Sequence, residues 1–305
     1  MKYIIATTDN QYFRWQILVQ INNFKRLGIL EDVTYVVSVK NRISNELKKI
    51  KEETNARIET YRDDRELSNY QPSVTAHVLK KHFNKYPKES NLFFYLDPDV
   101  IFTKKPQFPS TYYKTKKWIL SDTKSYLNSK YIKGKSEELF KLMCDEVGID
   151  TKTVIKYDSA AGGAQCIIKN ANSNYWGKVE KDCEKLYQLM KNTSKKYSPE
   201  HPIQSWTAEM WAVLWNAWLF GHRTIIDNRM GFSWATDVIE KYDKHWIYHN
   251  AGVFDQKYLF NKSLFAEKHP FNVDFSYVSK KYCSIKYVEE ILETKNNYKN
   301  LINKL

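Results

Sequence analysis

Short apolar runs alternate with helix-like segments through the first hundred residues, and this alternation limits the fold more than any other feature. Four runs rich in β-branched and aromatic residues have the length of buried strands, and they cover residues 2–8, 32–39, 56–63 and 92–96. Segments with a helical spacing of apolar residues lie between them, at about 12–27, 44–54 and 73–86. This order predicts a mostly parallel sheet with helices on its faces.

The second half of the chain has a less regular pattern. The strands that we expect there cover residues 118–122, 160–170 and 246–248, and the helices cover residues 136–147 and 205–221. The lysine-rich residues 191–202 read as a linker or a mobile loop. We therefore predict an α/β protein with a mostly parallel central sheet, flanking helices and a mixed C-terminal half.

Length and cysteine spacing narrow the class of protein. A chain of 305 residues can form one large domain or two small ones, with a substantial core. Its four cysteines form no CxxC pair, so neither a zinc site nor a disulfide framework is indicated, and a reducing compartment is the simplest expectation. The apolar run at the N-terminus is too short for a signal peptide, and residues 210–220 are too short to span a bilayer. We expect a cytoplasmic location.

Positive charge is concentrated in one segment. The net charge is +13, and residues 101–135 hold nine lysines but only one acid, Asp122. Five tyrosine and tryptophan residues lie between these lysines, and a basic segment of this kind suits a polyanionic partner. The alternative is a solvated surface in a chain that is rich in Lys, Asn, Ile and Tyr, as AT-rich codons would produce. The lysines are Lys104, Lys105, Lys114, Lys116, Lys117, Lys124, Lys130, Lys133 and Lys135.

Two aspartates stand one position apart at the end of the fourth predicted strand. Asp97 and Asp99 flank Pro98, and alternate residues of a strand face the same side. At ~4 Å two carboxylates repel each other by about 4 kcal/mol at an effective dielectric of 20, and a divalent cation would remove that repulsion. The alternative is that Asp-Pro-Asp only forms a turn that leaves the strand. The motif by itself leaves both interpretations open.

Polar residues follow three of the predicted strands, at the edge where parallel α/β sheets bind ligands. They are Thr7, Thr8 and Asp9 after the first strand, Arg62, Asp63 and Asp64 after the third, and Asp97 and Asp99 after the fourth. No GxGxxG turn follows the first strand and the chain has no P-loop, which argues against a dinucleotide site. We expect a different ligand at this edge.

Three further features have both a functional and a structural interpretation. Glu209 and Asn216 interrupt an apolar helix, and a buried carboxylate must be paired, protonated or functional, although Glu209 could also sit exposed in the first turn. Gly162 and Gly163 permit close approach of backbone to a ligand, but a bulge or tight turn is the commoner reason for such a pair. His249 follows a short strand and precedes a glycine-containing loop, where it could be a ligand, although a lone histidine is more often a structural residue.

Taken together, these segments resemble the GT-A class of nucleotide-sugar glycosyltransferases over most of the chain. Asp97 to Asp99 looks like the DxD motif, which in that class holds Mn²⁺ or Mg²⁺ against the donor diphosphate. Residues 158–168 resemble the stretch that lines the sugar pocket. His249, Gly252 and Lys257 resemble the histidine-x-x-glycine…lysine ending, in which the His is the third metal ligand and the Lys meets phosphate, although Lys257 lies further from Gly252 than in the family.

The resemblance implies a Rossmann-type, GT-A-like domain in which residues 1–103 bind the nucleotide and residues 104–305 bind the acceptor. It implies a metal, Mn²⁺ or Mg²⁺, held by Asp97, Asp99 and His249, and a nucleoside-diphosphate sugar donor, UDP-linked. The residues that it places at the donor are Thr7, Thr8, Asp9, Arg62, Asp64, Gly162, Gly163, Gln165, Gly252 and Lys257. Those expected at the reacting centre are Glu209 and Asp158.

Several acceptors fit this pattern. Asp-Pro-Asp-Val, a following Lys-Pro pair and Glu-Met-Trp-Ala resemble hydroxyproline arabinosyltransferases and peptidyl-serine galactosyltransferases, which implies a peptide hydroxyl. The basic segment and the AT-rich composition instead favour a hydroxymethylated cytosine in phage DNA, flipped out of the duplex, in the host cytoplasm. A surface glycan or lipid-linked sugar at an anionic membrane is a third acceptor.

Two other classes of protein remain open. A non-catalytic nucleic-acid-binding protein would account for the basic segment, and it predicts that Asp97, Asp99 and His249 do not meet in space. A nucleotidyltransferase would also pair carboxylates with Mg²⁺, but it would more usually need a third carboxylate near the pair and has no use for the His249 loop.

Overall fold

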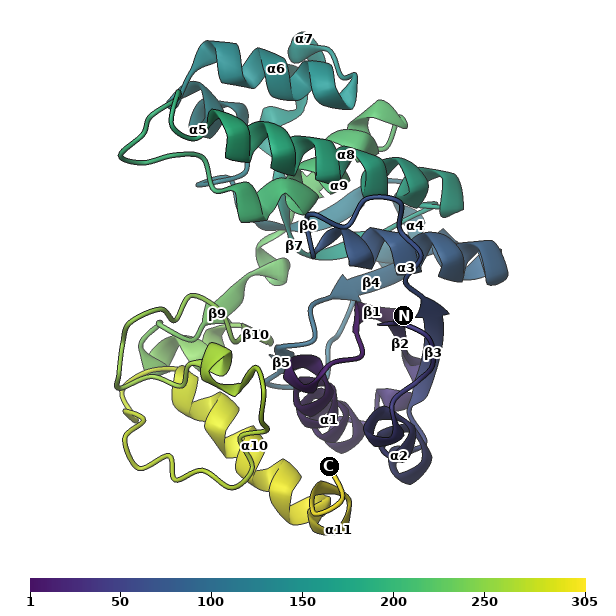
Figure 1. Ribbon diagram of the computed structural model, residues 1–305, viewed down its shortest axis with the longest axis vertical. Coiled ribbons are helices and arrows are strands. Elements are labelled where there is room, and N and C mark those ends of the chain that lie inside the picture. The colour runs from purple at the N-terminus through teal and green to yellow at the C-terminus, as the bar shows by residue number, and fades with distance from the viewer. The chain divides into compact units, whose positions relative to one another are not determined.

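The computed structural model describes all 305 residues as a mixed α/β protein (Figure 1). A seven-stranded sheet has the order β3-β2-β1-β4-β7-β6-β8, and a three-stranded sheet has the order β5-β10-β9. The strands are β1 Lys2–Thr8, β2 Val33–Val39, β3 Arg57–Arg62, β4 Phe93–Leu96, β5 Val100–Phe102, β6 Trp118–Asp122, β7 Gly162–Ile168, β8 Thr224–Ile226, β9 Phe232–Trp234 and β10 Ile247–His249.

Eleven α-helices accompany these strands. They are α1 Gln11–Arg26, α2 Asn45–Thr54, α3 Ser73–Lys85, α4 Ser110–Lys114, α5 Ser129–Lys133, α6 Glu137–Val147, α7 Thr151–Tyr157, α8 Ser173–Thr193, α9 Ala208–Leu219, α10 Ser284–Asn297 and α11 Lys299–Ile302. None of them is both long enough and apolar enough to span a bilayer.

The alternation predicted for the first hundred residues is confirmed, from β1 through α3 to β4. Side chains at the helix ends explain the boundaries: Asn10 caps α1 by accepting a hydrogen bond from the Phe13 N–H at 2.9 Å, and Ser44 caps α2. Gly148 ends α6 in the left-handed conformation, with φ of 76°. The linker prediction for residues 191–202 is wrong at its start, because α8 continues to Thr193.

Strand direction in the large sheet is mixed. β1 runs parallel to β2, and β6 runs parallel to β8. β7 runs antiparallel to both of its neighbours, β4 and β6. The register between β6 and β7 shifts after Leu120, so that Ala164 and Gln165 form a bulge on β7.

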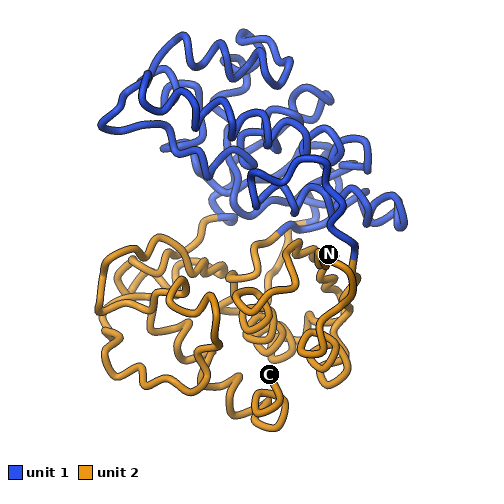
Figure 2. Tube along the Cα trace, viewed as in Figure 1, with its two compact units in different colours: residues 1, 61–95, 110–230 blue, residues 2–60, 96–109, 231–305 orange.

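The chain forms two compact units, each built from discontinuous segments (Figure 2). The first unit contains residues 1, 61–95 and 110–230, and the second unit contains residues 2–60, 96–109 and 231–305. The expected division at residue 103, into a half that binds the nucleotide and a half that binds the acceptor, stays a prediction. Both units have their own aromatic core, and we describe each by itself.

Helix packing provides the core of each unit. In the first unit, α8 packs against α3 and α9 (Figure 1). The buried Trp176 lies on α8, and the buried Trp211 and Trp215 lie on α9. In the second unit, α10 packs along α1, and Trp15 of α1 meets Tyr287 of α10 edge to face with ring centroids 6.3 Å apart. This packing holds α1 against the small sheet β5-β10-β9, which carries the site described next.

Candidate metal centre

The two aspartates lie in a turn and not on a strand. β4 ends at Leu96, and the Val100 N–H donates to the Asp97 carbonyl at 3.2 Å to close the turn before β5. The strand-alternation argument is therefore wrong as the reason why the two side chains face the same way. The turn interpretation and the metal-site interpretation are compatible, because the turn itself brings the two carboxylates together.

Strand pairing brings His249 to this turn. β10 runs antiparallel to β5, with His249 opposite Val100, the residue directly after Asp99. The Asn250 N–H then donates to the Asp99 carbonyl at 3.1 Å. The position of the imidazole beside the aspartates thus follows from the register of the small sheet, which unites segments far apart in the sequence.

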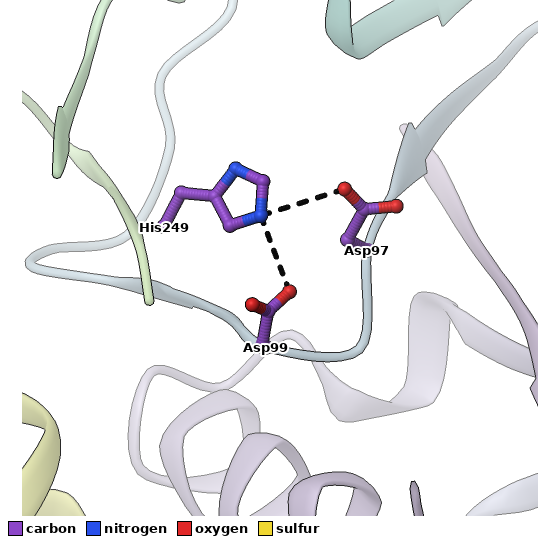
Figure 3. A group of neighbouring side chains, drawn as sticks. All are labelled: Asp97, Asp99 and His249. Carbon is purple, nitrogen blue, oxygen red and sulfur yellow. Dashed lines mark ion pairs between the residues drawn. The ribbon is translucent and has the colours of Figure 1, made fainter. Parts of the chain in front are cut away.

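Asp97, Asp99 and His249 converge on one point in the second unit (Figure 3). The His249 Nε2 lies 3.3 Å from Asp99 Oδ1 and 3.5 Å from Asp97 Oδ2, and one ligand atom from each residue lies within 4.8 Å of the others. Asp99 is buried, with 4% of its side chain exposed, whereas Asp97 is 39% exposed. The cluster is therefore open to ligands on the side of Asp97.

Buried polar side chains of α1 form hydrogen bonds with the backbone of the turn and of β5. Gln20 Nε2 donates to the carbonyls of Asp97 at 2.9 Å and Val100 at 2.7 Å. Asn23 pairs with the backbone of Phe102 through both ends of its amide, at 2.9 and 3.1 Å. The sequence did carry a signal for this role, because Gln16, Gln20 and Asn23 recur at helical spacing on an otherwise apolar helix face.

A lysine that the sequence reasoning missed lies at the centre. Lys262, at the start of the 3-10 helix Lys262–Phe265, places its ammonium group against Asp99 Oδ2. Lys257, the lysine expected there, is exposed and forms no ion pair. Nothing in the sequence pattern distinguished Lys262 from the many surface lysines.

Aromatic rings fix the imidazole. The Trp234 ring stacks on His249 with an interplanar angle of 14° and centroids 5.8 Å apart, and Phe232 lies at the same distance. Gly252 follows in the left-handed conformation, with φ of 84°, which a side chain there would strain. A Cβ at Gly252 would be 3.6 Å from Trp234, an ordinary contact, so conformation and not space accounts for the glycine.

The ionisable groups shift one another's pKa values. Burial would raise the pKa of Asp99, but Lys262 and then His249 outweigh it, so the pKa of Asp99 is lowered. The pKa of Asp97 is raised, first by burial and then by the Asp99 charge, although water reaches its half-exposed side chain. Burial would lower the pKa of His249, but the two aspartates raise it overall. Asp99 is therefore the more firmly ionised carboxylate of the pair.

This donor set fits a hard divalent cation. Two carboxylate oxygens and one imidazole nitrogen suit Mn²⁺ or Mg²⁺, whose other positions are usually filled by water or phosphate oxygens. Two aspartates held close together also need positive charge nearby, and Lys262 neutralises only one of them. The chemistry of the site thus agrees with a metal centre.

The residues after β1 have different surroundings. Thr7 Oγ1 is buried without a hydrogen-bond partner, and Thr8 is partly exposed at the end of the strand. Asp9 accepts hydrogen bonds from the Ser44 N–H and Oγ, both at 2.7 Å, and from Arg14 Nε at 2.8 Å. These contacts occupy Asp9 in joining α1 to the start of α2.

Arg62 and Asp64 lie in the first unit. Both are exposed, and Asp64 contacts His77 Nε2 at 3.0 Å and Lys81 Nζ at 2.5 Å. Lys81 is the largest cause of the lowered pKa of Asp64. Arg62 uses its carbonyl to accept a hydrogen bond from Lys81 at 2.8 Å, and its side chain is left to solvent.

The glycine pair opens β7 in the first unit, and it is tightly packed. A Cβ at Gly162 would lie 2.4 Å from Ile226 Cδ1 and 2.5 Å from the Ser121 carbonyl, so no side chain fits. Gly163 is less crowded: a Cβ there would lie 3.0 Å from Met210 Cε and 3.2 Å from Leu127 Cδ2, both of which are side-chain ends. The structure thus supplies a firm packing reason for Gly162 and a weaker one for Gly163.

Gln165 belongs to the bulge that follows the glycine pair. It is buried, and its Oε1 lies 3.2 Å from Ser121 Oγ. Ala164 has φ of 59°, an unusual conformation for alanine of the kind that is often kept at binding sites.

Asp158 and Glu209 also belong to the first unit. The Asp158 carboxylate accepts hydrogen bonds from the Ser129 N–H at 2.7 Å and Ser129 Oγ at 2.8 Å, which fixes the start of α5. Glu209 is half-buried in the first turn of α9; its carboxylate accepts a hydrogen bond from the Thr75 hydroxyl, and its N–H donates to Tyr70 Oη at 3.2 Å. Asn216 is engaged elsewhere, with Asp182.

No protein-family model matches this sequence, and no curated protein matches it either. Among solved structures, the apo structure of the bifunctional glycosyltransferase WbbM aligns with 99% of this chain at 9% identity and a TM-score of 0.50. The galactosyltransferase LgtC, in complex with donor and acceptor sugar analogs, aligns with 98% of this chain and 99% of its own at 10% identity and a TM-score of 0.47. Mouse xyloside xylosyltransferase 1 aligns with 82% of this chain and 97% of its own, at 10% identity and a TM-score of 0.41.

The likeness to WbbM concerns the fold. This chain spans about half of the WbbM chain, 51% of its length. The α/β fold that carries Asp97, Asp99 and His249 is that of a GT-A-type glycosyltransferase.

Proposed function

We propose that this protein is a metal-dependent glycosyltransferase that takes a sugar from a nucleoside diphosphate. The observation that carries the proposal is the convergence of Asp97, Asp99 and His249 at the end of β4, in a chain with a glycosyltransferase fold. The non-catalytic alternative predicted that these three residues would be apart, and their proximity counts against it.

The residues of the centre would divide the work among them. Asp97, Asp99 and His249 would hold the divalent ion, which when bound supplies positive charge opposite the donor diphosphate. Trp234 keeps the imidazole plane in place, and Gln20 keeps the turn closed. Lys262, placed at Asp99, would add a charge-assisted contact to the departing diphosphate.

We further propose Mn²⁺ as the ion and UDP as the nucleotide, with arabinose, galactose or glucose as the sugar. Support for these choices comes from the donor set and from the sequence resemblance. Thr7, with its unpartnered buried hydroxyl, and Thr8 are the candidate nucleotide contacts of the second unit. The bulge with Ala164 and Gln165 is the candidate sugar contact of the first unit.

Glu209 is the better candidate for the carboxylate at the reacting centre. Asp158 uses both of its oxygens to hold Ser129, whereas Glu209 is half-exposed and held in place by Thr75 and Tyr70. A carboxylate fixed by hydrogen bonds at a helix start can either accept a proton from an acceptor hydroxyl or stabilise positive charge on the sugar.

For the acceptor we propose a hydroxyl on a polyanion, and hydroxymethylated cytosine in phage DNA as the first to test. The basic segment supports this choice, because phosphate contacts dominate DNA affinity. A peptide hydroxyl and a surface glycan are the alternatives.

The test uses purified protein with Mn²⁺ and a panel of nucleotide sugars, with and without DNA that contains hydroxymethylcytosine. We expect release of a nucleoside diphosphate from one donor and loss of that release in Asp99→Asn, which keeps the shape of the side chain. A sugar found by mass spectrometry on the modified base supports the DNA acceptor, and donor hydrolysis without base modification excludes it. Turnover of no donor in the presence of Mn²⁺ would contradict the proposed activity.

A further inference from the structure

A pocket of about 420 Å³ opens beside α5 in the first unit. Its walls carry three lysines and three other hydrogen-bonding side chains, and no acidic residue lines it. These residues are Lys124, Lys130, Lys135, Ser125, Asn128 and Tyr131. Neither the metal centre nor the candidate donor contacts make use of this pocket.

Most of the positive charge in the pocket is not neutralised by the protein. Lys124 pairs with Asp122 at 3.3 Å, in an exposed ion pair. Lys130 and Lys135 form no ion pair, and the Lys135 ammonium lies 5.4 Å above the Tyr131 ring. Lysines brought together in a concave site without a carboxylate create a local positive potential that an anion would relieve.

The walls of the pocket are fixed by internal hydrogen bonds. Asn128 Oδ1 accepts from the Tyr131 N–H at 2.8 Å, so its amide N–H groups remain available as donors. Asp158 holds Ser129 through two hydrogen bonds, which fixes the start of α5. The lysines and donors thus stand on a preorganised frame, which lowers the entropy cost of binding.

We propose that this pocket binds a phosphate group of the ligand that receives the sugar. Lysine ammonium groups and the hydroxyl and amide donors of Ser125 and Asn128 match the several acceptor oxygens of a phosphate. The pocket is open to solvent and larger than one phosphate, so it leaves room for a further group of the ligand. The chemistry is the same for a phosphodiester of a nucleic acid and for a phosphorylated small molecule.

The pocket is joined to the segment that leads to Glu209. The Tyr131 hydroxyl lies near the backbone of Gln204, and Gln204 directly precedes the 3-10 turn Ser205–Thr207 at the start of α9. A phosphate held at Lys130 and Lys135 would therefore anchor the acceptor within the same unit as Glu209. That role as an acceptor anchor rests on the proposed transfer, whereas phosphate binding itself does not.

The test is lysine acylation of the full chain, followed residue by residue with mass spectrometry, in the absence of metal and donor. The probes are inorganic phosphate and a short DNA duplex, each at constant ionic strength because salt screens exposed charges. At a probe concentration of about ten times its dissociation constant, we expect acylation of Lys130 and Lys135 to slow about tenfold. Lys181 and Lys185, exposed lysines of α8, serve as the internal control.

Each outcome has a defined meaning. Protection by phosphate alone identifies a phosphorylated small molecule as sufficient, and protection by the duplex alone identifies a nucleic acid; both support the pocket. No protection, or equal protection of Lys181 and Lys185, overturns it. Since metal and donor are absent, this failure would leave the proposed transfer intact, and a failure of transfer would leave this result intact.

A pair of matched variants gives an independent measurement. If the duplex is the ligand, Lys130→Gln with Lys135→Gln should lower the slope of log K against log salt by about two, because two phosphate contacts are lost. Lys181→Gln with Lys185→Gln removes the same charge from α8 and should leave the slope unchanged. Equal slopes for the two double variants, after protection by the duplex, would overturn the assignment to this pocket.

Discussion

At the residue scale, we predict different effects on donor turnover for the substitution of two lysines of the C-terminal region. Lys262 contacts Asp99, and Lys257 is exposed without an ion pair. We expect Lys262→Met to lower donor turnover by about 100-fold, the usual effect of removing one group that stabilises developing charge. Lys257→Met removes the same charge and should leave turnover within about twofold, since exposed charges contribute little. Steady-state kinetics with the active donor decide between them, and the reverse ranking would return the phosphate role to Lys257.

Gln20 supports the turn from Asp97 to Val100 through its backbone and does not contact the carboxylates of that turn. Gln20→Met removes two hydrogen bonds to the carbonyls of Asp97 and Val100 while filling the same space. We expect the free energy of unfolding to fall by about 2–3 kcal/mol, because buried acceptors lose their donor. Urea titration followed by tryptophan fluorescence measures the change. An unchanged midpoint would mean that the turn holds itself.

The residues show where sequence reasoning succeeds and where it ends. Asp97, Asp99 and His249 could be singled out because together they resemble the DxD motif and the histidine-x-x-glycine ending of the GT-A class, although each motif alone also has a structural interpretation. Lys262 could not, because one lysine among many carries no local signal and its partner lies far away in the sequence. The occupation of Asp9 and Asp158 by serine backbone and hydroxyl groups likewise appears only in three dimensions.

At the scale of elements, Gly162 tests the junction of β6, β7 and β8. A Cβ at Gly162 would meet the Ile226 side chain and the Ser121 carbonyl at 2.4 and 2.5 Å. Because the carbonyl belongs to a buried sheet, Gly162→Ala should destabilise the protein by about 3 kcal/mol. The matched variant is Gly177→Ala within α8, where the nearest atom is the flexible Lys80 Cδ at 3.4 Å.

Gly177→Ala should raise the free energy of unfolding by about 0.5–1 kcal/mol, because alanine favours a helix over glycine. Chemical denaturation of the two variants beside the wild type gives both numbers. Two variants of equal stability would contradict the packing account of Gly162, and a destabilised Gly177→Ala would show that the Lys80 side chain cannot move aside.

Helices and strands were predicted better than the pairing and direction of the strands. Strands and helices of the first hundred residues have local signatures, so β1 to β4 could be read from periodicity. The antiparallel direction of β7 and the pairing of β10 with β5 depend on contacts between distant segments, which local pattern does not encode. His249 reaches the aspartates through that pairing.

At the scale of the whole molecule, the four cysteines report on the integrity of both cores. All are buried, and burial raises the pKa of Cys144 to about 12 and of Cys283 to about 11. We expect a thiol reagent such as dithionitrobenzoate to label none of them quickly between pH 7 and 9 until the protein unfolds. Rapid labelling of a native thiol would contradict the burial.

The same pKa shifts fix the sign of a stability change. The folded protein holds its thiol protons more tightly than the unfolded chain, in which the thiol pKa is about 8.5. The free energy of unfolding should therefore fall as pH rises above that value. Denaturant titrations at pH 8 and pH 10 measure the difference, and a Cys144→Ala, Cys283→Ala variant should show a smaller decrease.

The two units also mark the limit of what the chain order indicates. The first unit is built mainly from the middle of the sequence and the second mainly from its two ends (Figure 2). No segment with the composition of a linker marks the boundaries between them. The sequence could predict an α/β protein with a glycosyltransferase-like fold, and the likeness to WbbM confirms this fold class.

The most direct measurement of the central claim is the binding of Mn²⁺, followed by the electron paramagnetic resonance of the free ion. We expect one site in the wild type and a loss of affinity of more than about 100-fold in Asp99→Asn, since changes one shell further out already cost 10–100-fold. Asp145→Asn, an exposed carboxylate of α6, should bind Mn²⁺ as the wild type does. Equal Mn²⁺ affinity in Asp99→Asn and Asp145→Asn would contradict the metal centre.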